Sequence, residues 1–359
     1  MSLETEAYVC KAKGEPLKLE KIVLPPLEAN EVECDMVCCG LCHTDCHMCT
    51  NDWGISDFPM VPGHEGVGIV RAVGSAVSTH AVGDRVGIAW MRDSCQACEA
   101  CLCGRENICQ PGYQGTFLSK SAGVWGKKPY NLTGGCFSKV MRVAARFAFK
   151  IPEGVPDDVA CPLLCGGGTV YEPLCDYCEP GTQLGVAGIG GLGTAAIKLA
   201  KLRGVTPTAI SSSPHKKQAA LAAGAKDFVC FDDDLAAWAG KFDVIIDTSP
   251  ANTQPAATYL NLLKFGGTYC RVGIPAAGEG FKYDWIPLIF TQRKVVGSIV
   301  TGSKCMHSMF NLVKDNLDFL QADNPDLQNI EKVPFSQANA AMKNLVERKN
   351  KGYRYVLVW

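Results

Sequence analysis

The feature that most limits the fold is a glycine-rich segment, Gly188-Ile189-Gly190-Gly191-Leu192-Gly193, which directly follows a short apolar run at 184–187. The segment opens a stretch whose apolar residues recur at helical spacing. A strand, a G-x-G-x-x-G turn and a helix in this order form a dinucleotide fingerprint, because the glycines permit a tight turn and the helix N-terminus attracts a pyrophosphate. The alternative is a glycine-rich turn that binds nothing. The pattern favours a nucleotide site made by Gly188, Gly190, Gly191, Leu192 and Gly193.

The residues around this turn alternate between strand-like runs and helical stretches, which is typical of βαβ units and a parallel sheet. We expect six strands there, at 184–187, 208–211, 228–231, 244–247, 268–272 and 295–300. The first 150 residues instead read as short strands broken by Gly and Pro, such as 67–73 and 85–89, and predict a barrel-like all-β unit. The end of the chain adds helices at 309–320 and 338–346 and a strand at 353–358, which can pack on the first unit.

Length and charge agree with two globular domains that hold a small ligand. A chain of 359 residues exceeds one ordinary core. Its 35 basic and 36 acidic residues give a net charge of -1, so we expect neither nucleic acid nor an anionic membrane as a partner. The N-terminus has no long apolar run, and no later segment has the roughly 18 apolar residues of a membrane span, so we expect a cytoplasmic protein.

Twenty cysteines make metal binding the first property to consider, since a dense disulfide framework is unusual in a cytosolic chain. Cys95, Cys98, Cys101 and Cys109 have the spacing C-x2-C-x2-C-x7-C. Four thiolates this close can fill every position of a tetrahedral zinc ion, which would then be structural. An iron-sulfur cluster or unrelated thiols are the alternatives. Cys103, a fifth thiol in the loop, is interpreted as a bystander.

A second set of metal-ligand residues is spread over three segments, with Cys42 in 40–45, His64 in 62–66 and Cys165 in 162–166. Each residue alone is a weak signal, because a lone cysteine is often a buried apolar residue and a lone histidine a loop residue. Two cysteines and one histidine are nevertheless the ligands of a catalytic zinc whose fourth position stays open. A zinc ion of this kind polarises a carbonyl or lowers the pKa of an alcohol.

Two carboxylates accompany these ligands. Glu65 follows His64 and can replace water on the metal, and Asp45 can orient a ligand from behind. A structural salt bridge is the alternative for both.

The segment that follows the next strand bears on the choice of nucleotide. An NAD site places a carboxylate on the ribose about twenty residues after the glycine turn. Here the sequence reads Ser211-Ser212-Ser213-Pro214-His215-Lys216-Lys217 and has no carboxylate. Hydroxyls and an ammonium group can donate hydrogen bonds to a 2'-phosphate. The sequence therefore favours NADP over NAD, with Ser211, Ser212, Ser213 and Lys216 as the candidate contacts. A solvated helix start with a serine cap is the alternative.

Taken together, these motifs resemble the zinc-dependent medium-chain alcohol dehydrogenases, and within them the cinnamyl alcohol dehydrogenase group. The segments that carry the resemblance cover nearly the whole chain: 40–45 with His47, 51–54, 61–65, 95–109, 162–165, 188–193 and 211–217.

The resemblance implies an α/β fold, in which a doubly wound parallel Rossmann sheet joins a GroES-like β-barrel catalytic domain. The catalytic domain would span 1–158, completed by 298–359, and the Rossmann domain 159–297. It further implies zinc at two sites in each chain, NADP(H) and a homodimer. Thr44 would hold the substrate oxygen and His47 would take the proton, while hydride moves between the alcohol carbon and the nicotinamide.

Apolar and aromatic residues are candidate walls of the substrate pocket: Met48, Trp53, Ile55, Trp90 and Ile299. They predict reduction of aromatic or medium-length apolar aldehydes, reversible toward primary alcohols. Two rivals stay open, a reductase of C=C or iminium bonds that does not need the zinc, and a zinc and NADP-binding protein without catalysis.

Overall fold

A computed structural model describes residues 2–117, 133–250, 254–275, 280, 282–283, 285–318, 330–349 and 354–359. By its internal contacts the chain divides into two compact units. The first comprises residues 1–165, 301–317 and 329–359, and the second 166–300 and 318–328. The domain limits expected from the sequence, at 158/159 and 297/298, remain a prediction.

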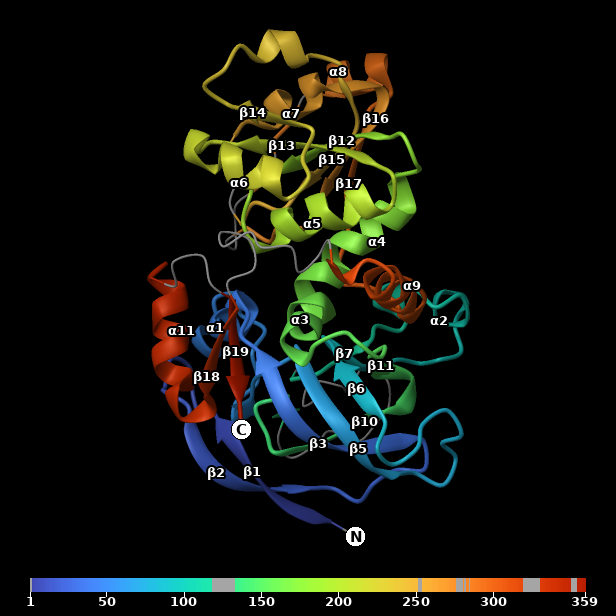
Figure 1. Ribbon diagram of the computed structural model, residues 1–359, viewed down its shortest axis with the longest axis vertical. Helices are drawn as coiled ribbons and strands as arrows, with labels where there is room; N and C mark the ends of the chain where they lie inside the picture. The colour runs from blue at the N-terminus through green and yellow to red at the C-terminus, as the bar shows by residue number, and fades with distance from the viewer. Residues whose placement is uncertain are drawn as a thin grey trace. The chain divides into compact units, whose positions relative to one another are not determined.

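The first unit is built on a seven-stranded sheet with the order β11-β6-β5-β3-β19-β18, and β10 also pairs with β3. Its strands are β3 (Glu31–Gly40), β5 (Gly66–Val73), β6 (Arg85–Ile88), β10 (Val140–Ala144), β11 (Ala148–Lys150), β18 (Ile330–Pro334) and β19 (Arg354–Val358). β19 lies antiparallel to β3 and places the end of the chain in this sheet, as expected (Figure 1).

Shorter elements complete the first unit. Three two-stranded pairs join β1 (Leu3–Val9) to β2 (Lys18–Leu24), β4 (Met60–Val61) to β9 (Thr133–Gly134) and β7 (Met91–Asp93) to β8 (Gln114–Gly115). Its α-helices are α1 (His43–Thr50), α2 (Glu99–Leu102), α3 (Asp157–Pro162), α9 (Ser303–Lys314) and α11 (Ala338–Val346).

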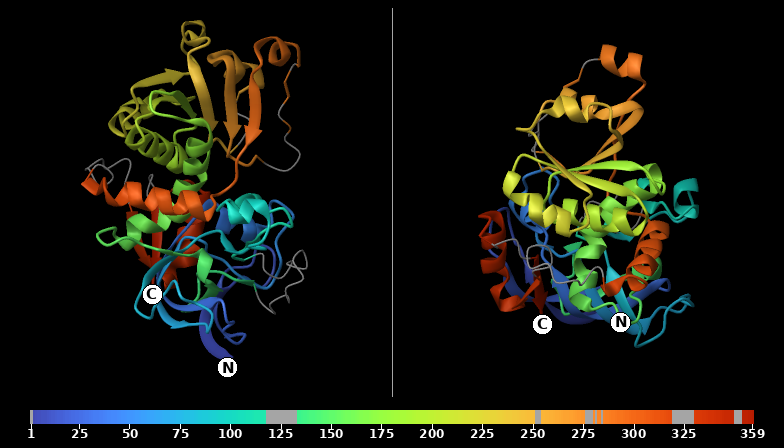
Figure 2. Two further views of the ribbon diagram at one scale, coloured as in Figure 1. Left: turned by 90° about the vertical axis from the view of Figure 1, so that its right-hand side faces the viewer. Right: turned by 45° about the horizontal axis from the view of Figure 1, so that its top comes forward.

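The second unit contains a parallel six-stranded sheet with the order β14-β13-β12-β15-β16-β17. The strands are β12 (Gln183–Ala187), β13 (Thr206–Ser211), β14 (Asp227–Cys230), β15 (Phe242–Asp247), β16 (Leu263–Arg271) and β17 (Lys294–Gly297). Its helices are α4 (Gly168–Tyr177), α5 (Gly191–Leu202), α6 (Lys217–Ala222), α7 (Ala256–Leu262) and α8 (Trp285–Thr291). In Figure 2 the green helices α4 and α5 lie against one side of this sheet.

The strand order of the second unit reverses direction at β12, which has β13 on one side and β15 on the other. In open parallel sheets a ligand binds at the carboxyl ends of the strands beside such a reversal. The glycine turn of residues 188–193 leaves β12 at this edge.

The six strands predicted for the second unit are all present, although β16 begins at Leu263 rather than 268 and β17 ends at Gly297 rather than 300. The predicted helix 309–320 is α9, which begins at Ser303, while residues 319–320 lie outside the described residues. Among the elements that the sequence did not predict are α1 and a five-residue π-helix, Leu163–Gly167.

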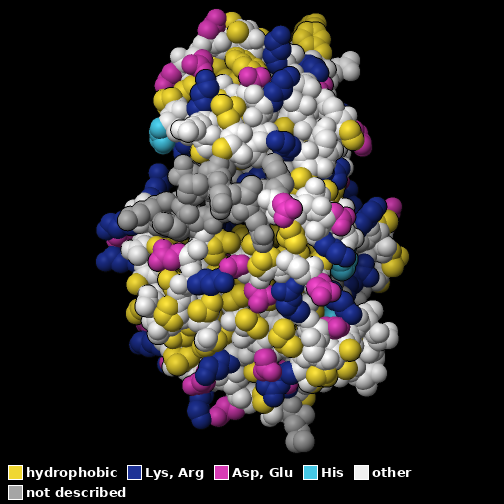
Figure 3. All heavy atoms as spheres, viewed as in Figure 1, with side chains coloured by type: hydrophobic (Ala, Val, Ile, Leu, Met, Phe, Trp, Pro, Cys, Tyr) yellow, Lys and Arg dark blue, Asp and Glu magenta, His cyan; other side chains and the backbone are white. Residues whose placement is uncertain are grey.

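None of the described helices has the length and apolar character needed to cross a membrane. On the face drawn in Figure 3, basic and acidic side chains are interspersed, which agrees with the balanced charge of the chain.

Candidate active site and nucleotide site

The three dispersed ligands converge in the first unit. Donor atoms of Cys42, His64, Glu65 and Cys165 all lie within 4.8 Å of one another. The Cys42 and Cys165 Sγ atoms are 4.0 Å apart, and His64 Nε2 is 3.2 Å from Cys165 Sγ. These separations fit a tetrahedral zinc ion, whose sulfur and nitrogen ligands lie about 2.0–2.3 Å from the metal. The two cysteines and the histidine therefore fit a zinc ion.

Each ligand comes from a different local structure. Cys42 caps the N-terminus of α1, His64 lies in the loop before β5, and Cys165 lies in the π-helix. π-Helical turns occur frequently at functional sites.

Asp45 holds two of these segments in place. Its Oδ1 accepts hydrogen bonds from His64 Nδ1 and from the Gly63 N–H, both at 3.0 Å, and its Oδ2 accepts the Cys42 N–H at 3.0 Å. The carboxylate has no exposed surface. With Nδ1 bonded to Asp45, the imidazole presents Nε2 to the cysteines, as a zinc-binding histidine does.

Glu65 is bonded to Arg354. Its two carboxylate oxygens accept from Arg354 Nη2 at 2.8 and 3.1 Å. Burial raises the pKa of Glu65 to about 7, and the charge of Arg354 opposes this rise. The structural salt bridge considered above as an alternative is thus present, while an exchange of Glu65 onto the metal stays a prediction. The sequence did not reveal Arg354, which lies 289 positions away.

Helix α1 carries the two residues expected to move the proton. Thr44 and His47 are three positions apart and therefore lie on one helix face. His47 Nδ1 bonds Asp52 Oδ2 at 2.7 Å, and its ring lies 5.0 Å from that of Trp53. The imidazole is partly exposed, so solvent reaches it.

Of the five predicted pocket walls, Trp90 contacts a candidate ligand, with its ring edge-on to that of His64 at a centroid distance of 5.4 Å. Phe117, a buried ring, contacts both His64 and Trp90. The Trp90 indole N–H donates to the Tyr113 hydroxyl at 3.1 Å, which fixes the orientation of the ring. An aromatic wall therefore stands beside the metal ligands.

The other predicted walls are placed differently. Met48 is completely buried and accepts the Ser56 hydroxyl at its main-chain oxygen, whereas Trp53 is half-buried and Ile55 is exposed. Ile299 belongs to the second unit. The role of all five in a pocket remains a prediction.

The four-cysteine loop also forms a compact cluster. The Sγ atoms of Cys101 and Cys109 are 3.0 Å apart, those of Cys95 and Cys109 3.3 Å, and those of Cys98 and Cys109 3.6 Å. The backbone N–H groups of Cys101 and Gln110 lower the pKa of Cys98 to about 6, so this thiol is ionised near neutrality. The donor set fits a structural zinc, and the exposed Cys103 stands outside the cluster.

Glu106, which the sequence did not single out, joins this loop to α9. Its carboxylate accepts the Ser303 N–H at 2.8 Å and the Ser303 hydroxyl at 2.7 Å, and it pairs with Arg146. The residue is completely buried. Nothing in the local sequence distinguishes it from any other glutamate.

The nucleotide turn has the expected form in the second unit. Gly188 has a φ of +82°, and a Cβ on Gly193 would lie 2.0 Å from the Gly188 oxygen, so both positions require glycine. Around Gly190, by contrast, no atom lies within 4 Å of a Cβ position, so the turn is open there. Helix α5 begins at Gly191 and presents its free N–H groups to this opening.

The residues expected to choose the nucleotide follow β13. Ser211 is buried, with its hydroxyl accepting the Ser213 N–H at 3.1 Å, while Ser212 is exposed. Lys216 reaches the glycine turn, where its ammonium group donates to the Ile189 oxygen at 2.8 Å. The structure therefore brings Lys216 and the glycine turn together, as a site for a phosphorylated ribose requires.

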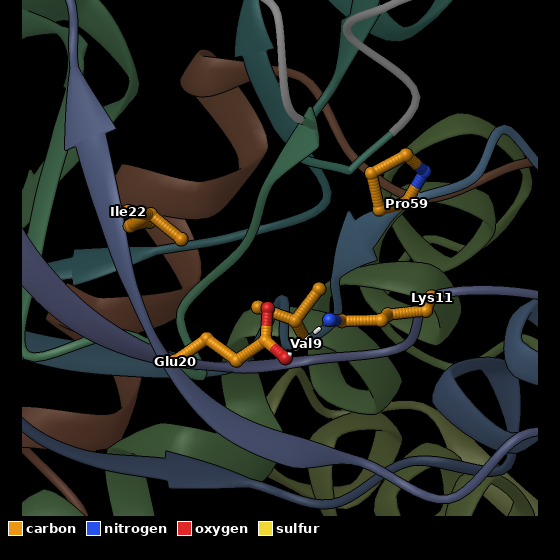
Figure 4. A pocket seen from close by; sticks show the side chains of 5 residues that line it. All are labelled: Val9, Lys11, Glu20, Ile22 and Pro59. Carbon is orange, nitrogen blue, oxygen red and sulfur yellow. Dashed lines mark ion pairs between the residues drawn. The ribbon is translucent and has the colours of Figure 1, made fainter.

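A separate hollow of about 390 Å³ lies beside the β1–β2 pair and is lined by Val9, Lys11, Glu20, Ile22 and Pro59 (Figure 4). Lys11 and Glu20 form an ion pair of 2.7 Å within it. Its lining shares no residue with either metal cluster, so it is not the active site.

Comparison with known proteins places the chain in a family. Residues 28–153 match the alcohol dehydrogenase GroES-like domain, and residues 191–315 match the zinc-binding dehydrogenase domain. The chain is 38% identical over 350 residues to a probable formaldehyde dehydrogenase of Bacillus subtilis, covering 97% of this chain and 94% of the relative. It is 37% identical to cinnamyl alcohol dehydrogenase 7 of Arabidopsis thaliana, with coverage of 99% and 96%.

Solved structures agree. A cinnamyl alcohol dehydrogenase of Sorghum bicolor has a TM-score of 0.85 and 34% identity, with coverage of 99% of this chain and 98% of that one. One from Helicobacter pylori, solved in complex with NADP(H), has a TM-score of 0.85 and 30% identity, with coverage of 100% and 99%. The chain therefore belongs to the zinc-dependent medium-chain alcohol dehydrogenases, oxidoreductases acting on CH–OH groups, and within them to the cinnamyl alcohol dehydrogenase group. This confirms the predicted fold class.

Proposed function

We propose that the protein interconverts aromatic or medium-length apolar aldehydes and primary alcohols with NADP(H). The observation that carries the proposal is the convergence of Cys42, His64 and Cys165 on one point, backed by Asp45. Bound there, a zinc ion supplies a Lewis acid that polarises a carbonyl oxygen. NADP(H), bound at the glycine turn, supplies or accepts the hydride.

The chain's own residues then have separate tasks. Thr44 holds the substrate oxygen through its hydroxyl, and His47 exchanges the proton with solvent. Because Asp52 bonds His47 Nδ1, the proton of the neutral ring stays on that nitrogen and Nε2 remains free to accept. Trp90 and Phe117 form an apolar wall beside His64, which supports an apolar or aromatic substrate.

The choice of NADP(H) over NAD(H) is supported by the residues after β13. No carboxylate occurs between Ser211 and Lys217, and the ammonium group of Lys216 lies at the glycine turn. The Helicobacter pylori relative was solved with NADP(H).

The first test is to purify the protein under reducing conditions, measure zinc per chain, and compare NADPH and NADH oxidation over aldehydes from cinnamaldehyde to short aliphatic ones. We expect two zinc ions per chain and turnover selective for NADPH. A Ser212→Asp variant should lose that selectivity, because the new carboxylate repels a 2'-phosphate, while Asp227→Ser, an exposed exchange on the next strand, should keep it.

Other outcomes would overturn the proposal. Zinc binding without turnover of any aldehyde would favour a binding protein. Full turnover of a C=C or iminium substrate by Thr44→Val would favour the rival reductase, since that chemistry does not require the proton relay.

We also propose that the protein is a homodimer that associates through the second unit. Helix α8 exposes Trp285, Ile286, Ile289 and Phe290, and the neighbouring β17 is the edge strand of the parallel sheet. Exposed apolar groups of this size beside an open sheet edge are typical of a contact between subunits. A cytoplasmic location is supported by the 20 cysteines, which all lie in the described part of the chain and form no disulfide bond there.

A further inference from the structure

Arg271, the last residue of β16, joins the ends of two neighbouring parallel strands. Its Nη1 donates to Asp247 Oδ2 at 3.0 Å, and Asp247 is its register partner at the end of β15. Its Nη2 donates to the Ser249 oxygen at 3.0 Å and its Nε to the Gly273 oxygen at 2.9 Å. One guanidinium group thus holds the main chain of both loops that leave this edge of the sheet.

The direction of the Arg271 guanidinium is set by the carboxylate of Asp247, which also accepts hydrogen bonds from two other groups. Asp247 is completely buried. Its Oδ1 accepts the Ser249 N–H at 2.9 Å, and its Oδ2 accepts the Tyr269 hydroxyl at 2.6 Å in addition to Arg271. A carboxylate buried this deeply is stable only with such partners, so it cannot reorient without losing several hydrogen bonds.

The loop after β15 in turn supports the glycine turn. A Cβ on Gly188 would lie 2.8 Å from Ser249 Oγ and 3.0 Å from Ser249 N, so the two residues are in close contact. The Thr248 hydroxyl donates to the Gly188 oxygen at 2.6 Å, and the Thr248 N–H donates to the Ala187 oxygen at 2.9 Å. A continuous set of contacts therefore runs from Arg271 through Ser249 to Gly188.

We propose that Arg271 is a positioning residue for the nucleotide, which fixes the glycine turn in its binding geometry through Asp247 and Ser249. The proposal rests on the proposed function, because it takes this sheet edge to be the NADP(H) site. The strand order reverses beside β12 and β15, so the loops that Arg271 ties border the crevice where a nucleotide binds. A turn already held in the bound shape loses less freedom on binding, which raises affinity.

The position of the charge supports a role beyond filling the core. Central strands of a parallel sheet are largely apolar, and the buried part of β16 that precedes Arg271, residues 267–270, has no charged side chain. A guanidinium at the strand's end, with 16% of its side chain exposed, meets main-chain oxygens of two loops rather than solvent. Binding several groups in a fixed fork is what distinguishes arginine from lysine.

The test compares NADPH dissociation constants, measured by quenching of protein fluorescence in the full-length zinc-loaded protein. The Arg271→Met single variant would leave Asp247 buried without a counter-charge. It would lose stability for that reason alone, whatever its effect on NADPH binding. The double variant Asp247→Asn/Arg271→Met removes both charges and keeps an acceptor for the Ser249 N–H. We expect it to bind NADPH about tenfold more weakly, with Arg271→Lys between it and the unaltered protein.

Arg293→Met is the matched control. Arg293 also donates to main-chain oxygens, those of Leu263 and Lys264, but at the start of β16, the opposite edge of the sheet. We expect this variant to lower thermal stability and leave the dissociation constant unchanged. In turnover, the double variant should raise KM for NADPH and leave KM for the aldehyde unchanged, a split that loss of stability alone would not produce.

The results separate the two proposals. Unchanged NADPH affinity in the double variant, or an equal loss in Arg293→Met, would overturn the role of Arg271 while leaving the proposed function intact. Failure of the unaltered protein to bind NADPH would overturn the proposed function, and the role of Arg271 with it.

Discussion

At the scale of single residues, the carboxylate of Asp45 organises the candidate metal site without being one of its ligands. It has no exposed surface and accepts hydrogen bonds from His64, Gly63 and Cys42. Two of these residues, His64 and Cys42, are candidate metal ligands. Their side chains can converge only while Asp45 holds the two segments that carry them close together.

Exchanging Asp45 for asparagine should therefore weaken zinc binding at the Cys42, His64 and Cys165 site. An amide has one acceptor oxygen, so at least one of the three N–H groups loses its partner. Loss of such an outer partner typically costs about 10–100-fold in metal affinity. Competition with a chromophoric chelator measures the effect. Asp35→Asn, an exposed carboxylate paired with Arg71, should bind zinc normally, and normal affinity in the Asp45 variant would contradict the prediction.

The side chains that converge in each cluster could be predicted as candidate ligands, because their motifs occur together although each residue alone is a weak signal. The partners that hold them could not. Arg354 and Glu106 are ordinary charged residues, and only the fold brings Arg354 to Glu65 and Glu106 to Ser303. Long-range pairs of this kind leave no local pattern.

At the scale of elements, the parallel strands were predicted well and the short helices poorly. Strands buried on both faces contain continuous apolar runs, as β12 does at 184–187 and β15 at 244–246. Helix α1 reads His-Thr-Asp-Cys-His-Met-Cys-Thr and has no apolar face at helical spacing. Asp45 in its first turn bonds the Cys42 N–H and so caps the helix, a local signal that apolar periodicity does not detect.

Helix α9 begins where the chain returns to the first unit, and its first residue is held by Glu106 of the zinc loop. A Glu106→Gln variant should lower the free energy of unfolding by about 1–3 kcal/mol, because the amide cannot serve Ser303 and Arg146 together. Urea unfolding of the zinc-loaded protein measures this change. Glu99→Gln, an exposed exchange in the same loop, is the control, and equal stability of the two variants would refute the role of Glu106.

At the scale of the whole molecule, the proposed dimer can be tested on helix α8. Phe290 has 80% of its surface exposed, which is costly for a phenyl ring in water. A Phe290→Lys variant should sediment as a monomer at micromolar concentration, since the charge would have to be buried in the contact. Val82→Lys, an exposed apolar residue of the first unit, should leave the mass unchanged. A monomeric unaltered protein would exclude the dimer.

The bond from Lys216 to the Ile189 oxygen has a consequence for the rate of nucleotide exchange. At the proposed NADP(H) site the carbonyl would act as an internal competitor, since an arriving phosphate would displace it and a departing phosphate would be replaced by it. The ammonium group would then pass between two partners without losing both, which would lower the barrier in both directions. In many enzymes the release of the spent nucleotide limits turnover. In such a case this exchange would lower the affinity for the nucleotide and raise the rate of turnover.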